Sequence, residues 1–145
     1  MIEKSIEPMT NNKNINIVNL MANIKRIKEF NDPNTIKVVV DNNDFALYFS
    51  REPIPSKVYY KSKIKMLKQV CVIPFRRDFL LEYNSLKESA LEKIESIDMN
   101  RILENGMAIQ MVPINHHIHA VDTKEDLMKV EKIISKDTLF LEKQY

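Results

Sequence analysis

The chain has 145 residues, of which 44% are hydrophobic and 29% are charged, and this composition is ordinary for a single globular domain. Lys and Arg number 22 against 20 Asp and Glu, so the net charge of +2 indicates neither nucleic acid nor an acidic membrane surface as a partner. The single glycine is far below the usual ~7% and excludes from this sequence the glycine-rich loops that bind phosphates in P-loop and dinucleotide-binding proteins.

The first elements that local pattern predicts are two short strands. "TIKVVV" (35–40) and "FALYFS" (45–50) flank the dense turn signal "DNND", which predicts a β-hairpin. "QVCVIPF" (69–75) is a continuous apolar run, typical of a strand that is buried on both faces. Its Cys71 is expected to pack in the core. As the only cysteine it excludes an internal disulfide and favours a reducing cytoplasm, and no apolar run approaches the ~20 residues of a membrane span.

Helical patterns alternate with strands in the second half of the chain. Residues 76–86 predict a short amphipathic helix, and 90–104 predict a longer one that ends at the only glycine and shows Glu92 and Glu95 on a solvated face. "MAIQMVPI" (107–114) alternates as a strand, and 121–134 passes from a strand end into a helix. The alternation predicts one α/β domain over 1–145, with a layered mixed sheet flanked by helices.

Six separated motifs resemble the 3-deoxy-manno-octulosonate cytidylyltransferases. They occur in the family's order and rough spacing between about Phe30 and Ile134. They are "FNDPNTIKVVVD", "ALYFSREPIP", "FRRDFLLEYNSL", "LEKIES", "RILENG" and "VDTKEDL". The resemblance implies the C-terminal part of a nucleotide-diphospho-sugar transferase (Rossmann-like) fold. It also implies transfer of CMP from CTP to an acid sugar, with release of pyrophosphate, in lipopolysaccharide or capsule synthesis.

The resemblance implies a role for five residues. Arg51 matches an arginine of the sugar-acid site, where its guanidinium suits a carboxylate. Asp98 and Met99 stand at a Glu-Gln pair that faces the sugar, with Asp98 as the catalytic candidate. Gln69 stands at a histidine that contacts the sugar, and Asp122 matches a ligand of Mg²⁺. Asp122 or Thr123 also suits the N-cap of the helix that follows, so both interpretations of Asp122 remain open.

Some of the family pattern is missing from the sequence. Residues 1–29 match it poorly, and "SIEP" (5–8) resembles the remains of a Gly-Asp-Glu-Pro turn, with Ile6 in place of its Mg²⁺-binding Asp. The implied contribution of the chain is therefore sugar binding and dimerisation, as a homodimer or together with a separate N-terminal chain that holds CTP. Two alternatives stay open: a noncatalytic dimerisation or partner-binding module, and a cytidylyltransferase for another acid sugar.

Overall fold

The computed structural model describes residues 1–58, 64–115, 121 and 124–136. The chain divides into two compact units, Met1–Asn115 and His116–Tyr145, where the sequence predicted one domain. None of the helices within the described residues is long and apolar enough to cross a membrane.

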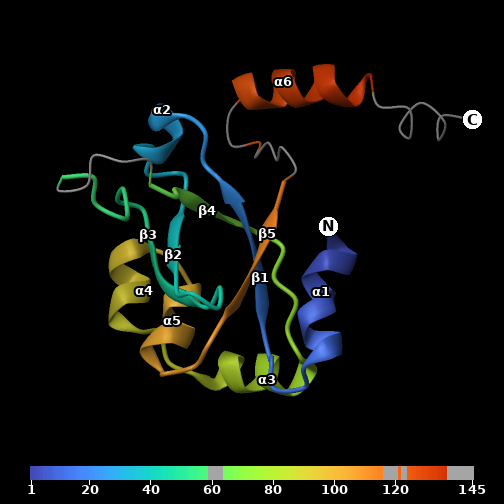
Figure 1. The fold of residues 1–145 in the computed structure, drawn as a ribbon, viewed down its shortest axis with the longest axis vertical. Helices are drawn as coiled ribbons and strands as arrows, with labels where there is room; N and C mark the ends of the chain where they lie inside the picture. The colour runs from blue at the N-terminus through green and yellow to red at the C-terminus, as the bar shows by residue number, and fades with distance from the viewer. Residues whose placement is uncertain (59–63, 116–120, 122–123, 137–145) are drawn as a thin grey trace, which may run out of the picture. The chain divides into compact units, whose positions relative to one another are not determined.

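The first unit contains five strands and five helices within its described residues (Figure 1). In chain order they are α1 (Ile2–Asn11), β1 (Val18–Asn23), α2 (Ile27–Phe30), β2 (Lys37–Val40), β3 (Ala46–Ser50), β4 (Leu67–Val70), α3 (Arg77–Ser85), α4 (Ala90–Glu95), α5 (Met99–Glu104) and β5 (Gln110–Ile114). The second unit contains α6 (Lys124–Ile134).

The five strands form one mixed sheet in the order β3-β2-β4-β1-β5. Only β1 and β5 pair in parallel, and the other neighbours are antiparallel. The start of β3 also meets β5, because Phe45 bridges Gln110, Ala46 N donates to Ile109 O at 2.9 Å and Met111 N donates to Asp44 O at 2.7 Å. The two outer strands of the sheet therefore meet, and the sheet curls onto itself. The antiparallel pair β2–β3 confirms the predicted hairpin, and the strand order with its one parallel pair confirms the mixed sheet.

The core fills the inside of the curl and the space under the helices that follow β4. Its buried members come from every strand and from α3, α5 and the turn before α5, and include Met21, Phe49, Leu67, Phe79 and Met111. At ~25 cal/mol per Å² of apolar surface removed from water, burial of each large side chain contributes roughly 1.5–3 kcal/mol. The helices thus hold the hairpin in place through shared packing.

The amino-terminal residues form a helix where the resemblance suggested a turn. "SIEP" lies inside α1, whose buried residues Ser5 and Met9 are one helical turn apart. Ile6 is exposed on that helix, and residues 5–8 are helical rather than the remains of a turn. The strand β1 was not predicted, because its asparagines mask the apolar pattern.

The apolar run 69–75 forms a shorter strand than predicted. β4 ends at Val70, and Val72 N then donates to Val70 O at 2.7 Å, which makes a tight turn. Cys71 at the centre of this turn is exposed, so its expected place in the core is wrong. The chain nevertheless continues beside β1, since Val18 N donates to Pro74 O at 3.1 Å.

The predicted helix 90–104 is broken in two. α4 ends at Glu95, and Ser96 takes the left-handed conformation with φ of 54°. Since an L-residue other than glycine rarely adopts this conformation, contacts elsewhere must hold it. The break places Glu95 on one helix and Asp98 at the start of the next.

Candidate functional site

Arg51 joins the end of β3 to the turn between α4 and α5. Its guanidinium donates from Nε to Glu95 O at 2.8 Å, from Nη2 to Ser96 O at 3.1 Å and from Nη1 to Pro33 O at 3.0 Å. A guanidinium has five N–H donors, and these bonds use three of them. The half-buried Arg51 is therefore fixed beside the turn that leads to Asp98.

The carboxylate of Glu95 holds the backbone of Arg51 in place, a role that was not predicted from the sequence. Its carboxylate accepts from Arg51 N at 2.8 Å, from Ser50 Oγ at 2.8 Å and from Tyr48 Oη at 3.0 Å. Burial by itself would raise the pKa of Glu95, but the bonds from Arg51, Ser50 and Tyr48 lower it on balance. Glu95 is thus an ionised link between α4 and the edge strand, and its expected place on a solvated face is wrong.

Lys37 lies next to the backbone of Arg51 and is fully buried. Its ammonium donates to Asp32 O at 3.0 Å and also to Arg51 O. Burial lowers the pKa of Lys37, although Asp32 and Glu52 oppose this effect. Both backbone polar groups of Arg51 are therefore held, the N–H by Glu95 and the carbonyl by Lys37.

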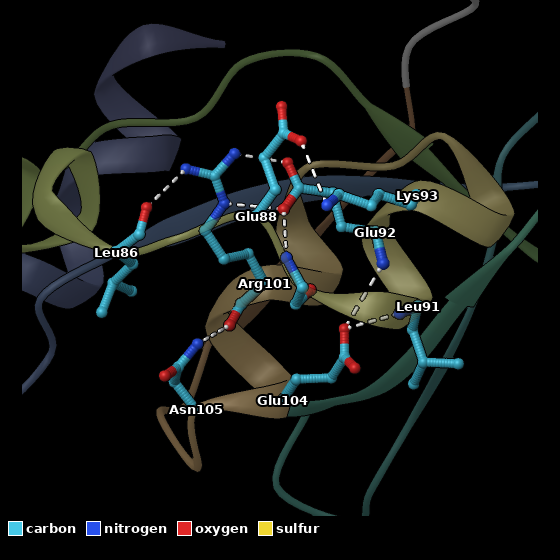
Figure 2. Close-up of polar contacts among 9 residues, drawn as sticks. Leu86, Glu88, Leu91, Glu92, Lys93, Arg101, Glu104 and Asn105 are labelled. Atoms are coloured by element: carbon cyan, nitrogen blue, oxygen red, sulfur yellow. Dashed lines mark hydrogen bonds and ion pairs between the residues drawn. The ribbon is translucent and has the colours of Figure 1, made fainter.

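A buried ion pair fixes α4 against α5 (Figure 2). Glu92 accepts two bonds from Arg101, one from Nε at 2.7 Å and one from Nη2, and Ser89 N donates to the same carboxylate at 3.1 Å. The hydrogen bonds from Arg101 are the main reason that the pKa of Glu92 is lowered. Glu92 pairs with Arg101 on the buried side of the helix, so its expected place on a solvated face is wrong. This pair holds the 96–98 turn at a fixed angle between the helices.

Asn100 covers the free edge of β3. Its Nδ2 donates to Phe49 O at 3.0 Å, and its Oδ1 accepts from Phe49 N at 3.3 Å. The fully buried Asn100 thereby pairs with the edge strand as a neighbouring strand would. α5 is anchored to the hairpin at the residue next to Met99.

Asp98 and Met99 face opposite ways, although they are neighbours. Asp98 is exposed and lies in an open hollow of about 330 Å³, lined by Glu88, Glu92, Lys93, Ser96, Ile97 and Asp98. Met99 is 1% exposed and belongs to the hydrophobic core. The predicted contact between Met99 and a substrate is not compatible with this burial, whereas Asp98 is free to accept a hydrogen bond from solvent or a ligand.

Gln69 lies on β4, separated from β3 by β2. Its backbone N–H donates to Ile36 O at 2.9 Å, and its side chain donates from Nε2 to Asn19 Oδ1 at 2.8 Å. The structure thus places Arg51 at the turn before Asp98, and Gln69 two strands away in the same sheet. No signal in the sequence pointed to Asn19.

The candidate Mg²⁺ ligand Asp122 lies outside the described residues. Within the described part of the chain, no group of three or more His, Cys, Asp or Glu side chains is arranged to hold a metal ion. The carboxylates of Glu92 and Glu95 are each occupied by several protein donors, so they do not fit as metal ligands. The described residues provide no metal site.

This architecture is that of the nucleotide-diphospho-sugar transferase fold. A solved structure described as CMP:2-keto-3-deoxy-manno-octonic acid synthetase complexed with CTP superposes with a TM-score of 0.85 and 33% sequence identity. The match covers 92% of this chain and 55% of that one. The family model for cytidylyltransferases matches residues 1–109. The chain belongs to the cytidylyltransferase family, as the six motifs indicated, and the matched range includes residues 1–29.

Curated relatives support the same family. The 3-deoxy-manno-octulosonate cytidylyltransferase of Fusobacterium nucleatum is 36% identical over 142 residues, which are 96% of this chain and 56% of the relative. The protein of the same name from Syntrophotalea carbinolica is 37% identical over 139 residues, which are 90% of this chain and 56% of the relative. The chain spans a little more than half the length of the curated relatives it matches.

Proposed function

We propose that this chain supplies the acid-sugar-binding part of a cytidylyltransferase that transfers CMP from CTP to an acid sugar such as 3-deoxy-manno-octulosonate. The observation that carries the proposal is the fixed placement of Arg51 beside the 96–98 turn. It is supported by similarity to proteins described as 3-deoxy-manno-octulosonate cytidylyltransferase and as CMP:2-keto-3-deoxy-manno-octonic acid synthetase. In the proposed reaction a sugar hydroxyl attacks the α-phosphate of CTP and pyrophosphate leaves. Such a transfer depends on positioning and on neutralised charge.

Each residue has a distinct proposed role. The two N–H donors of Arg51 that the three carbonyl bonds leave over bind the sugar carboxylate, and Asp98 accepts a hydrogen bond from a sugar hydroxyl. Gln69 contacts the sugar from β4. Because Arg51 is held by its backbone N–H, its carbonyl and its guanidinium, little conformational freedom is lost when it binds.

We assign the CTP phosphates to a segment equivalent to the part of the relatives that this chain does not match. The sequence has one glycine, Gly106, and this residue lies after α5 rather than in a phosphate-binding loop. Mg²⁺, with Asp122 as one proposed ligand, would neutralise phosphate charge during transfer. A cytoplasmic location remains a prediction from the sequence.

The experiment is an assay of pyrophosphate release from CTP, 3-deoxy-manno-octulosonate and Mg²⁺. A fusion that adds the unmatched N-terminal part of the Fusobacterium relative is expected to turn over, and the chain alone is not. The intact relative serves as the positive control. An inactive but folded fusion contradicts the proposed function. Turnover by the chain alone that is lost in Asp122→Ala contradicts the assignment of CTP to another segment.

One observation on α6 suits assembly with another protein, which the noncatalytic alternative requires. This helix exposes several large apolar side chains, namely Leu127, Met128, Ile133 and Ile134. Exposed apolar surface of this kind suits contact with another protein surface. A dimer or partner contact through α6 fits both the catalytic proposal and a module that only assembles, and the turnover of the fusion separates the two.

A further inference from the structure

The polar pair Asn19 and Gln69 lies on two adjacent strands and has no part in the contacts described around Arg51. Asn19 on β1 is completely buried, whereas Gln69 on β4 is half-buried. An asparagine inside a central strand costs free energy unless its amide is hydrogen-bonded. Here both ends of the amide are used.

The hydrogen bonds fix which way each amide faces. The carbonyl oxygen of Val70 can only accept, so the Asn19 atom 2.8 Å away is Nδ2 and donates. The other end of Asn19 is therefore Oδ1, which can only accept. The Gln69 atom 2.8 Å from Oδ1 must then be Nε2. A flipped Gln69 amide would set two acceptor oxygens against each other.

The consequence concerns the other end of Gln69. Because Nε2 is held by Asn19, the amide oxygen Oε1 is on the other side of the Gln69 amide. No residue in the described part of the chain donates a hydrogen bond to this oxygen. A carbonyl oxygen accepts but cannot donate. The half-buried Gln69 thus offers an acceptor to any ligand that reaches it.

We propose that Asn19 is a positioning residue that fixes Gln69 as a hydrogen-bond acceptor for a hydroxyl of the acid sugar. This rests on the proposed function in one respect, that Gln69 faces the sugar. The pair selects a ligand that donates at this position and disfavours one that presents an acceptor there. Asn19 contributes to this selection without touching the ligand, because it fixes the orientation of the Gln69 amide.

The first arm of the experiment tests the amide orientation without any ligand. In the ¹⁵N-labelled chain, one side-chain N–H of Gln69, assigned by its loss in Gln69→Met, is expected to exchange slowly with water because it donates to Asn19. Asn19→Leu is expected to abolish this protection. Asn19→Thr should restore part of it, because a hydroxyl can donate to Val70 O and accept from Gln69. Rapid exchange of both protons in the parent chain would overturn the inference.

The second arm measures binding of 3-deoxy-manno-octulosonate and of its monodeoxy analogues by calorimetry. Gln69→Met and Asn19→Leu are each expected to weaken binding about two- to tenfold, the range for one neutral hydrogen bond. The double variant should bind no more weakly than Gln69→Met. The analogue that lacks the hydroxyl bound by Gln69 should bind these variants and the parent with equal affinity.

The outcomes separate this inference from the proposed function. If Gln69→Met weakens binding but Asn19→Leu does not, the positioning role is wrong and the sugar site stands. If no sugar binds the parent chain, or if Arg51→Ala binds as the parent does, the proposed function is contradicted, and the role of the pair toward sugar is overturned with it. A protected Gln69 proton would then show only that the amide is fixed.

Discussion

Arg51 donates two hydrogen bonds to Glu95, one from its backbone and one from its side chain. Arg51 N donates to the carboxylate of Glu95 at 2.8 Å, and Arg51 Nε donates to the backbone carbonyl of Glu95, also at 2.8 Å. Arg51 directly follows β3, and Glu95 is the last residue of α4. The relationship fixes the end of β3 to the acidic turn and sets the direction of the Arg51 side chain.

Removal of the Glu95 carboxylate is expected to destabilise the chain. Glu95→Ala leaves the hydroxyls of Tyr48 and Ser50 and the N–H of Arg51 without their acceptor. We expect a loss of about 2–3 kcal/mol in the free energy of unfolding, measured by urea denaturation, since bonds to charged groups contribute ~1.5–3 kcal/mol. Glu88→Ala is the control. It loses an exposed ion pair with Lys93 and should change stability by less than ~1 kcal/mol. Equal losses in the two variants would contradict the role of Glu95.

Stability is expected to decrease in acid because of Glu92 and Glu95. The folded pKa of each lies below the ordinary value of 4.5. The unfolded chain therefore takes up protons first, so the stability is fully present above that value and is lost as the pH falls through the folded pKa. Urea denaturation between pH 7 and pH 3 should show a shallower pH dependence for Glu92→Gln/Glu95→Gln than for the parent. Parallel curves would exclude these carboxylates as the source.

Breaking the pair between Glu92 and Arg101 is expected to be costly. Arg101→Met leaves the buried carboxylate of Glu92 without its partner, and loss of one member of a buried pair costs about 3–5 kcal/mol. Arg101→Lys keeps the charge but cannot donate two parallel bonds, so its loss should be smaller. Glu92→Leu/Arg101→Leu should recover part of the stability. A double variant less stable than Arg101→Met would contradict this explanation.

Self-association is expected through α6. The free edge of β3 is not expected to provide the contact, because Asn100 covers this edge, and β3 also meets β5 at Phe45 and Gln110. Leu127 and Ile134 are seven residues apart and therefore share one face of α6. Sedimentation velocity across a concentration series should show a dimer or larger species, and Leu127→Glu/Ile134→Glu should give a monomer. Lys132→Glu, which changes the charge on the other side of α6, should not. A parent chain that stays monomeric at all concentrations would exclude this surface.

Local patterns predicted those elements whose residues carry a complete signal. The β2–β3 hairpin and α3 followed from the turn signal and from amphipathic spacing. β1 was missed because Asn19 interrupts its apolar pattern, and the bond partner that makes this asparagine acceptable, Val70, is 51 residues away. The break at Ser96 was missed because helical spacing continues across it, whereas the contacts that impose it reach to the edge strand.

The candidate site depended on the family resemblance more than on pattern. Arg51 was selected within a motif and Asp98 by its position between two motifs, and the structure places Arg51 at the turn before Asp98. Glu95 could not be recognised from the sequence, because its partners Tyr48 and Ser50 lie 47 and 45 residues away. Met99 was selected because it stands at a family position that faces the sugar, and packing places it in the core instead.

The measurement that tests the central claim most directly is titration of 3-deoxy-manno-octulosonate into the parent chain, Arg51→Ala and Arg77→Ala. Arg77 is exposed and pairs only with Asp78 among the described residues, so it controls for loss of one positive charge. The account predicts that Arg51→Ala binds about ten- to a hundredfold more weakly, the loss for a charge-assisted bond of ~1.5–3 kcal/mol, and that Arg77→Ala binds as the parent does. Equal affinities for Arg51→Ala and the parent, with Arg51→Ala still folded, would contradict the assignment of an acid-sugar site to this chain.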